Sequence, residues 1–145
     1  MDQVMALRDN GRPPLVTTRT QGLHSSGQAR RITRAFLSSL SLPPPAESAE
    51  SVLLVVSELV TNALRHAQGV TEFRLGAAHG TVTVEVADPS SALPAERAPG
   101  SLDEAEQGGF GWPIVRHLAS DITIRLRHGQ GKIIHAGIPL LDPAV

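Results

Sequence analysis

The chain has 145 residues, of which 41% are hydrophobic and 3% aromatic, and its 13 Lys and Arg against 14 Asp and Glu leave a formal net charge of -1. This length allows one domain with one core. The charge balance and the scarcity of aromatic residues argue against direct nucleic-acid binding, and the absence of cysteine excludes disulfides and cysteine nucleophiles. No apolar run has the length of a membrane helix and residues 1–14 lack a signal-peptide core, so we expect a soluble cytoplasmic protein with no membrane association.

The N-terminal third is basic and contains the first predicted helix. Residues 1–13 lack periodicity and are expected to be a flexible segment, and residues 15–18 form a short strand candidate. From His24 to Leu40 apolar residues recur at steps of three and four, which predicts an amphipathic helix. Three of its side chains fall off the apolar stripe: Arg30, Arg31 and Arg34. Such a basic face fits either docking of an acidic partner or simple solvation.

The rest of the chain contains two further helical patterns and four strand patterns. The longest predicted helix runs from about Ala46 to Ala67, and Gly69 ends it. Alternating apolar residues then predict a hairpin with strands near 73–77 and 82–86, and a second one near 122–126 and 134–138. Between them lie a long loop over residues 89–109, expected to be mobile without a ligand, and a short helix over residues 111–119.

Grouped rather than alternating elements indicate the fold class. We predict an α+β, two-layer sandwich with helices on one face of a mixed, mostly antiparallel sheet. Residues 14–140 would form this single domain, and residues 141–145 a short tail.

Three polar side chains line one edge of the apolar face of the long helix. Glu58, Asn62 and His66 follow one another at steps of four residues. A carboxylate and an amide in such a face need a partner, for example a metal ion, water or a ligand. Rotation of the three side chains toward solvent satisfies them as well, so the spacing alone leaves both interpretations open.

Two further motifs flank the long loop. Asp88 ends the first hairpin, where an Asp before Pro89 is usually a turn former. The run Gly108-Gly109-Phe110-Gly111 opens the short helix, and its glycines could either let backbone N–H groups approach an anion or hinge the loop. The six histidines have no metal-binding spacing, so no zinc site is predicted.

Taken in order, these motifs resemble the ATP-binding superfamily of DNA gyrase, histidine kinases and heat-shock chaperones, known as the GHKL or Bergerat fold. Residues 57–67 resemble the N-box of the small anti-sigma factor serine kinases. Residues 86–90 are similar to the first glycine box, residues 109–115 to the second, and Gly131-Lys132 with the following strand to the closing hairpin. The resemblance covers about residues 14–140.

The resemblance implies a role for each motif residue. Glu58 matches the general base, Asn62 the magnesium ligand, and Asp88 the carboxylate that accepts from the adenine amino group. Gly109 and Gly111 match the glycines that admit the phosphates to the helix N-terminus. The implied cofactors are therefore ATP and Mg²⁺.

The implied function is that of a magnesium-dependent ATP-binding regulatory protein, a serine/threonine kinase and anti-sigma factor. Its implied partners are an anti-anti-sigma (STAS-like) protein, a sigma factor, or both, and a second copy in a homodimer. Two alternatives stay open: a nucleotide-sensing binding module without kinase activity, and a detached histidine-kinase catalytic domain. Phe110 and Trp112 replace the arginine and leucine common in the second box, which favours the binding module, and Ser90 and Ile133 also depart from the usual boxes.

Overall fold

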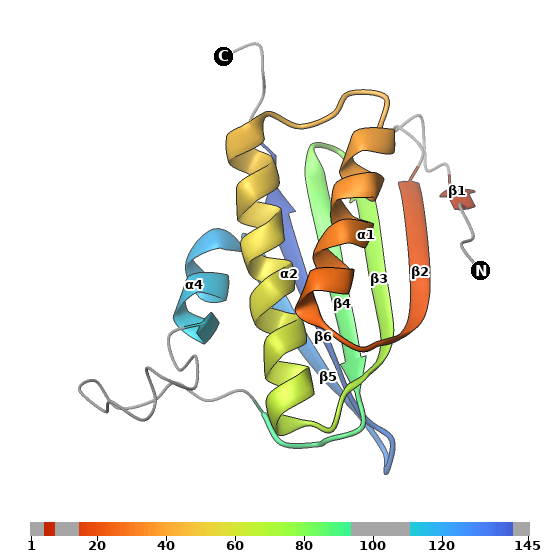
Figure 1. The fold of residues 1–145 in the computed structure, drawn as a ribbon, viewed down its shortest axis with the longest axis vertical. Coiled ribbons are helices and arrows are strands. Elements are labelled where there is room, and N and C mark those ends of the chain that lie inside the picture. Colours follow the sequence, from red (N-terminus) through yellow and green to blue (C-terminus); the bar gives the residue numbers. More distant parts are fainter. Residues whose placement is uncertain (1–4, 8–14, 94–110, 141–145) are drawn as a thin grey trace.

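One six-stranded sheet carries the helices on one of its faces (Figure 1). The computed structural model describes residues 5–7, 15–93 and 111–140. Its strands lie in the order β1-β2-β3-β4-β6-β5, and each of the five neighbouring pairs is antiparallel. The elements are β1 (Met5–Leu7), β2 (Leu15–Leu23), α1 (Ser26–Ser39), α2 (Ala46–His66), β3 (Val70–Ala78), β4 (Thr81–Asp88), α4 (Gly111–Leu118), β5 (Asp121–Arg127) and β6 (Gly131–Pro139).

The two-layer α+β sandwich predicted from the sequence is confirmed. Each predicted helix and both hairpins are present, with boundaries within a few residues of those expected. The strand predicted over residues 15–18 is β2, which continues to Leu23. The short strand β1, which no pattern predicted, pairs with the first residues of β2. Residues 94–110, which include most of the predicted loop, lie outside the described residues.

The core lies between α2 and the middle of the sheet. Alternate residues of β3, β4 and β6 point toward the helices, as the period of two requires. Burying such a side chain contributes roughly 1.5–3 kcal/mol relative to leaving it exposed, so this layer fixes how α2 sits on the sheet. The residues that are at most 1% exposed include Val52, Val55, Val56, Leu59 and Val60 from α2, and Phe73, Leu75, Val82, Val84, Val86 and Ile138 from the sheet.

Local signals set the ends of the two long helices. Ser25 accepts a hydrogen bond from the backbone N–H of Gln28 at 3.1 Å, and the Gln28 side chain accepts one from the backbone N–H of His24 at 2.9 Å, one residue before the position used in a capping box. At the C-terminal end of α2, Gly69 has a positive φ of 119° and its N–H donates to the carbonyl of Ala63 at 2.9 Å. Gln68, which precedes Gly69, also has a positive φ of 64°, so the chain turns away from the helix at these two residues and α2 stops where the glycine predicted.

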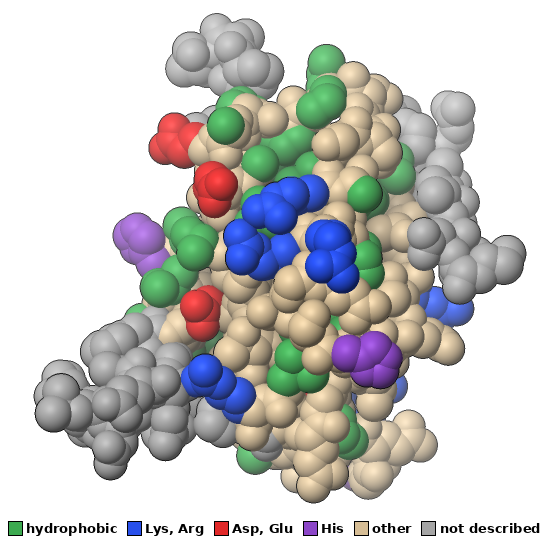
Figure 2. Space-filling view, in the orientation of Figure 1, with side chains coloured by type: hydrophobic (Ala, Val, Ile, Leu, Met, Phe, Trp, Pro, Cys, Tyr) green, Lys and Arg blue, Asp and Glu red, His purple; other side chains and the backbone are tan. Residues whose placement is uncertain are grey.

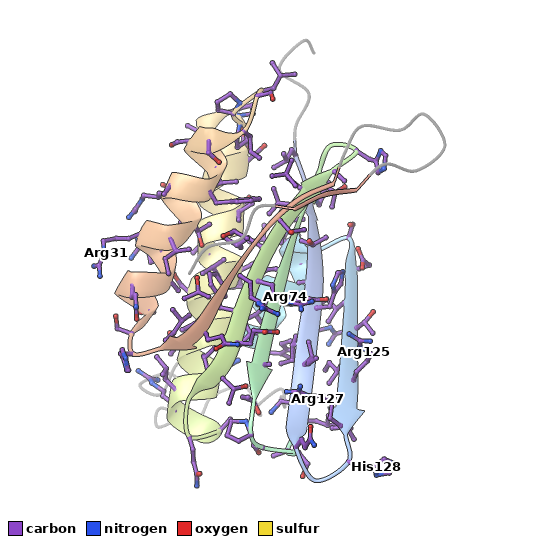
Figure 3. The ribbon with its side chains drawn as sticks, turned by 90° about the vertical axis from the view of Figure 1, so that its right-hand side faces the viewer. Arg31, Arg74, Arg125, Arg127 and His128 are labelled. Carbon is purple, nitrogen blue, oxygen red and sulfur yellow. The ribbon has the colours of Figure 1, made fainter. Side chains whose placement is uncertain are left out.

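The sheet face away from the helices carries a row of charged side chains (Figure 3). Glu72 lies 3.5 Å from Arg19 and 3.2 Å from Arg74. Glu85 lies 3.8 Å from Arg74 and 3.0 Å from His135. These residues sit on neighbouring strands, and their side chains are partly exposed, so the row keeps this face hydrated and contributes little to stability.

None of the helices in the described ranges combines the length and the hydropathy needed to cross a bilayer.

Candidate functional site

Helix α2, which carries Glu58 and Asn62, lies beside β4, which ends at Asp88, and α4, which begins at Gly111 (Figure 1). Helix α2 packs against α4 as well as against β4 and β6. The N-box helix therefore adjoins the strand that ends at Asp88, the helix that begins at Gly111 and the strand that begins at Gly131, although these segments are far apart in the sequence.

Glu58 lies directly against the first residue of α4. A Cβ atom placed on Gly111 would overlap the Glu58 carboxylate and would lie only 2.7 Å from its Cδ atom. Only glycine therefore allows the start of α4 to approach this carboxylate so closely. The structure thus brings together two predicted site residues that are 53 positions apart in the sequence (111 − 58 = 53).

Burial changes the acidity of this carboxyl group. Loss of hydration raises the pKa of Glu58 above 4.5, and the positive charge of Arg65 lowers it by a smaller amount. A carboxylate with a raised pKa is a better proton acceptor than an exposed one. The environment of Glu58 is therefore compatible with the predicted general base.

Asn62 lies one helical turn after Glu58 and is half-buried. Within residues 5–7, 15–93 and 111–140, no group of three or more His, Cys, Asp or Glu side chains could hold a metal ion. Mg²⁺ is usually held by one or two protein oxygens together with substrate phosphates and water, so a single amide oxygen on Asn62 fits that donor set. His66 ends α2, its side chain lies outside the description, and Gly109 lies outside the described residues.

Asp88 forms a buried ion pair with Lys132. The Lys132 Nζ atom lies 3.1 Å from one carboxylate oxygen of Asp88 and 3.0 Å from the other. Asp88 is 2% exposed and Lys132 is 4% exposed. Asp88 also accepts a hydrogen bond from the backbone N–H of Ser90 at 2.9 Å, the turn contact expected of a strand-end Asp.

The backbone at Gly131 allows this pair to form. Gly131 has a positive φ of 90°, and a Cβ there would overlap the Asp88 carbonyl oxygen and lie 2.6 Å from the Pro89 Cα. The start of β6 thus lies directly on the end of β4, and the sheet register places Asp88 opposite Lys132.

Lys132 is a partner of Asp88 that the sequence did not predict. Gly131-Lys132 was recognised as part of the closing hairpin, but no spacing rule connected it to Asp88. A lysine at an inward position of an otherwise apolar strand (Ile134, Ala136 and Ile138 follow it) is the signal that could have indicated a buried counter-ion.

Comparisons with known proteins point to one family. A family model described as a histidine kinase-like ATPase domain matches residues 20–137. An anti-sigma F factor of Pasteuria penetrans is 31% identical over 121 residues, which covers 74% of this chain and 77% of that protein. A blue-light-activated histidine kinase 2 of Erythrobacter litoralis (strain HTCC2594) is 34% identical over 105 residues, which covers 66% of this chain and 29% of the kinase. The stretch matched by the family model includes Glu58, Asn62, Asp88, Gly111 and Lys132.

Proposed function

The chain belongs to the histidine kinase-like ATPase family, and on that premise we propose that it binds ATP with Mg²⁺ and transfers the γ-phosphoryl group to a serine or threonine of a small regulatory protein. The observation that carries this proposal is the contact between Glu58 and the first residue of α4. It sets a partly desolvated carboxylate beside a helix N-terminus, where backbone N–H groups favour phosphate.

Each residue has a task in this proposal. Asp88 accepts from the adenine amino group, the N–H groups at the start of α4 hold phosphate oxygens, and the Asn62 oxygen binds Mg²⁺. The metal ion, when bound, neutralises phosphate charge. Glu58 accepts the proton of the incoming hydroxyl while the new oxygen–phosphorus bond forms and the bond to the leaving ADP breaks. Positioning and charge stabilisation supply most of the rate acceleration in such transfers.

The relative named anti-sigma F factor suggests the class of partner. We propose that the phosphorylated protein is an anti-anti-sigma (STAS-like) factor, that the same surface can hold a sigma factor, and that the chain acts as a homodimer. An exposed basic cluster is available for docking: Arg30, Arg31 and Arg34 all lie on the solvent side of α1. Figure 2 shows basic side chains gathered on the helical face of the molecule.

Reversing two of these charges tests the docking surface. We expect Arg30→Glu with Arg34→Glu to slow partner association, because exposed charges steer encounters more than they hold the complex. The effect should shrink at high salt, while ATP affinity and thermal stability stay unchanged, since the core side of α1 is not altered. Surface plasmon resonance at low and high salt measures the association rate, and an unchanged rate at low salt would reduce the cluster to a solvated helix face.

Asp88 also predicts which nucleotide binds. A fixed acceptor pairs with the amino group of adenine and meets the carbonyl oxygen of guanine unfavourably, so we expect ATP to bind roughly 10- to 100-fold more tightly than GTP. Titration calorimetry with both nucleotides in the presence of Mg²⁺ measures the two Kd values. Equal affinities would contradict the role of Asp88.

A second candidate function is nucleotide-dependent partner binding without phosphoryl transfer. The residues at positions 110 and 112, Phe and Trp, favour it because they provide no cation near the phosphates. A kinase assay with the isolated partner distinguishes the two functions. If a phosphoprotein forms, its stability in acid separates phosphoserine from the acid-labile phosphohistidine that a detached histidine-kinase domain would produce.

A further inference from the structure

We propose that Lys132 is the specificity-determining residue of the base site, because it keeps Asp88 a pure hydrogen-bond acceptor. The preference for a purine that carries an amino group over one that carries an oxo group would then depend on a residue that does not itself touch the base. This inference deepens the proposed function and rests on it, since it concerns how the same site selects its nucleotide.

Lys132 directs its ammonium group at Asp88 and at the turn that follows it. Besides the two carboxylate oxygens of Asp88, its Nζ atom lies 3.3 Å from the carbonyl oxygen of Ser90. Two of these contacts are hydrogen bonds, one to Asp88 and one to Ser90, and the contact with the second carboxylate oxygen is an ion pair. Lys132 therefore acts as a positioning residue that holds Asp88 from within the protein.

Asp88, in contrast, keeps free acceptor capacity. An ionised carboxylate offers about four acceptor sites and no donor. The Ser90 N–H and the Lys132 ammonium occupy three of these sites at most. What remains can accept an N–H and can donate nothing, so this carboxylate favours an amino group and disfavours a carbonyl oxygen.

The burial of the pair makes the ammonium necessary. Asp88 is 2% exposed, and a buried carboxylate without a counter-charge is strongly unfavourable. Without Lys132 the carboxylate would have to turn toward water to be solvated. That rearrangement removes the fixed acceptor from the base site.

The fold holds the two side chains together, unlike the ion pairs on the open face of the sheet. Asp88 and Lys132 are register partners on the helix-facing side, whereas the side chains of Arg74 and Glu85 on the opposite face are 49% and 23% exposed. An exposed pair of that kind has little effect on its surroundings. Arg74 is therefore a matched control, a cation removed from the same sheet but from its hydrated face.

The test measures nucleotide preference in Lys132→Met, Lys132→Arg and Arg74→Met. Calorimetry gives Kd values for ATP, GTP and purine riboside triphosphate, which lacks the amino group. We expect the parent and Arg74→Met to prefer ATP over both others by about tenfold or more, and Lys132→Met to reduce this preference to within about threefold. Lys132→Arg should recover part of the preference, because it restores the positive charge.

A double variant guards against loss of folding. Asp88→Asn with Lys132→Met leaves no buried charge unpaired, and its amide can both donate and accept, so its preference should also fall to within about threefold. A folded Lys132→Met variant that keeps the parental preference overturns the role of Lys132 while ATP binding stands. A folded double variant that keeps this preference overturns the role of Asp88 as the group that recognises adenine, and with it the role of Lys132. A parent that binds no nucleotide overturns the proposed function and this inference with it.

Discussion

Glu58→Ala is expected to lower the rate of phosphoryl transfer by about 10²- to 10⁴-fold while the Kd of ATP stays nearly unchanged. The carboxylate lies against Gly111 at the start of α4. In the proposed function it takes the proton of the incoming hydroxyl there, whereas Asp88 recognises the adenine. Single-turnover transfer to the partner measures the rate, and calorimetry measures the affinity. Full turnover in Glu58→Ala would show that another group is the base.

Asn62→Ala should give the opposite division of effects. Because this amide is proposed to hold the metal ion, its loss should weaken ATP binding in Mg²⁺ and have little effect on binding measured in EDTA. The parent is the control for both variants. If the parent transfers no phosphoryl group to any partner, the binding-module function is favoured.

The raised pKa of Glu58 adds a pH dependence to this prediction. The base acts in its ionised form, so the rate should fall as the pH drops through the pKa of Glu58, and burial places this fall above 4.5. Arg65 lowers the pKa of Glu58, so Arg65→Gln should move the fall to higher pH. A pH–rate profile that does not move in Arg65→Gln would argue against Glu58 as the group that titrates.

The second large effect is expected at Gly131. In Gly131→Ala the methyl group would meet the Asp88 carbonyl and Pro89 while the residue keeps a φ near 90°, so both steric overlap and backbone strain arise. We expect a loss of about 3 kcal/mol or more in the free energy of unfolding, together with loss of ATP binding.

Gly129 supplies the matched control for that variant. It has a φ of 65° in the same hairpin, but a Cβ there would meet open space. Gly129→Ala should therefore cost only the strain, about 1–2 kcal/mol, and leave ATP affinity intact. Urea denaturation measures both variants, and equal losses would mean that the close approach to Asp88 and Pro89 contributes nothing.

Elements with a strong hydrophobic period could be predicted from the sequence. The apolar face of α2 and the alternation in β3, β4 and β6 follow directly from burial against one another. Strand β2 was predicted too short because its continuation, Arg19-Thr20-Gln21, has no apolar alternation and is held by pairing with β3. Only tertiary context makes those residues a strand.

The candidate site could be predicted in its members but not in its contacts. The family resemblance indicated Glu58, Asn62, Asp88 and the glycines, since these are recognisable motifs. The contact of Glu58 with Gly111 and the pairing of Asp88 with Lys132 depend on how α4 and β6 dock, which no local pattern encodes. A buried charge finds its partner through sheet register, and register is decided by the whole sheet.

The position of β6 inside the sheet has a consequence for how the chain folds during synthesis. Strand β4 emerges from the ribosome well before its neighbour, and the two residues of the buried pair are 44 positions apart. Until residues 131–139 have been made, β4 exposes an unpaired edge of apolar character, the kind of surface that aggregates or recruits chaperones. A nascent chain arrested before residue 131 would therefore contain the complete N-box. In our proposal it would still be unable to select adenine, because Asp88 would lack the ammonium group of Lys132.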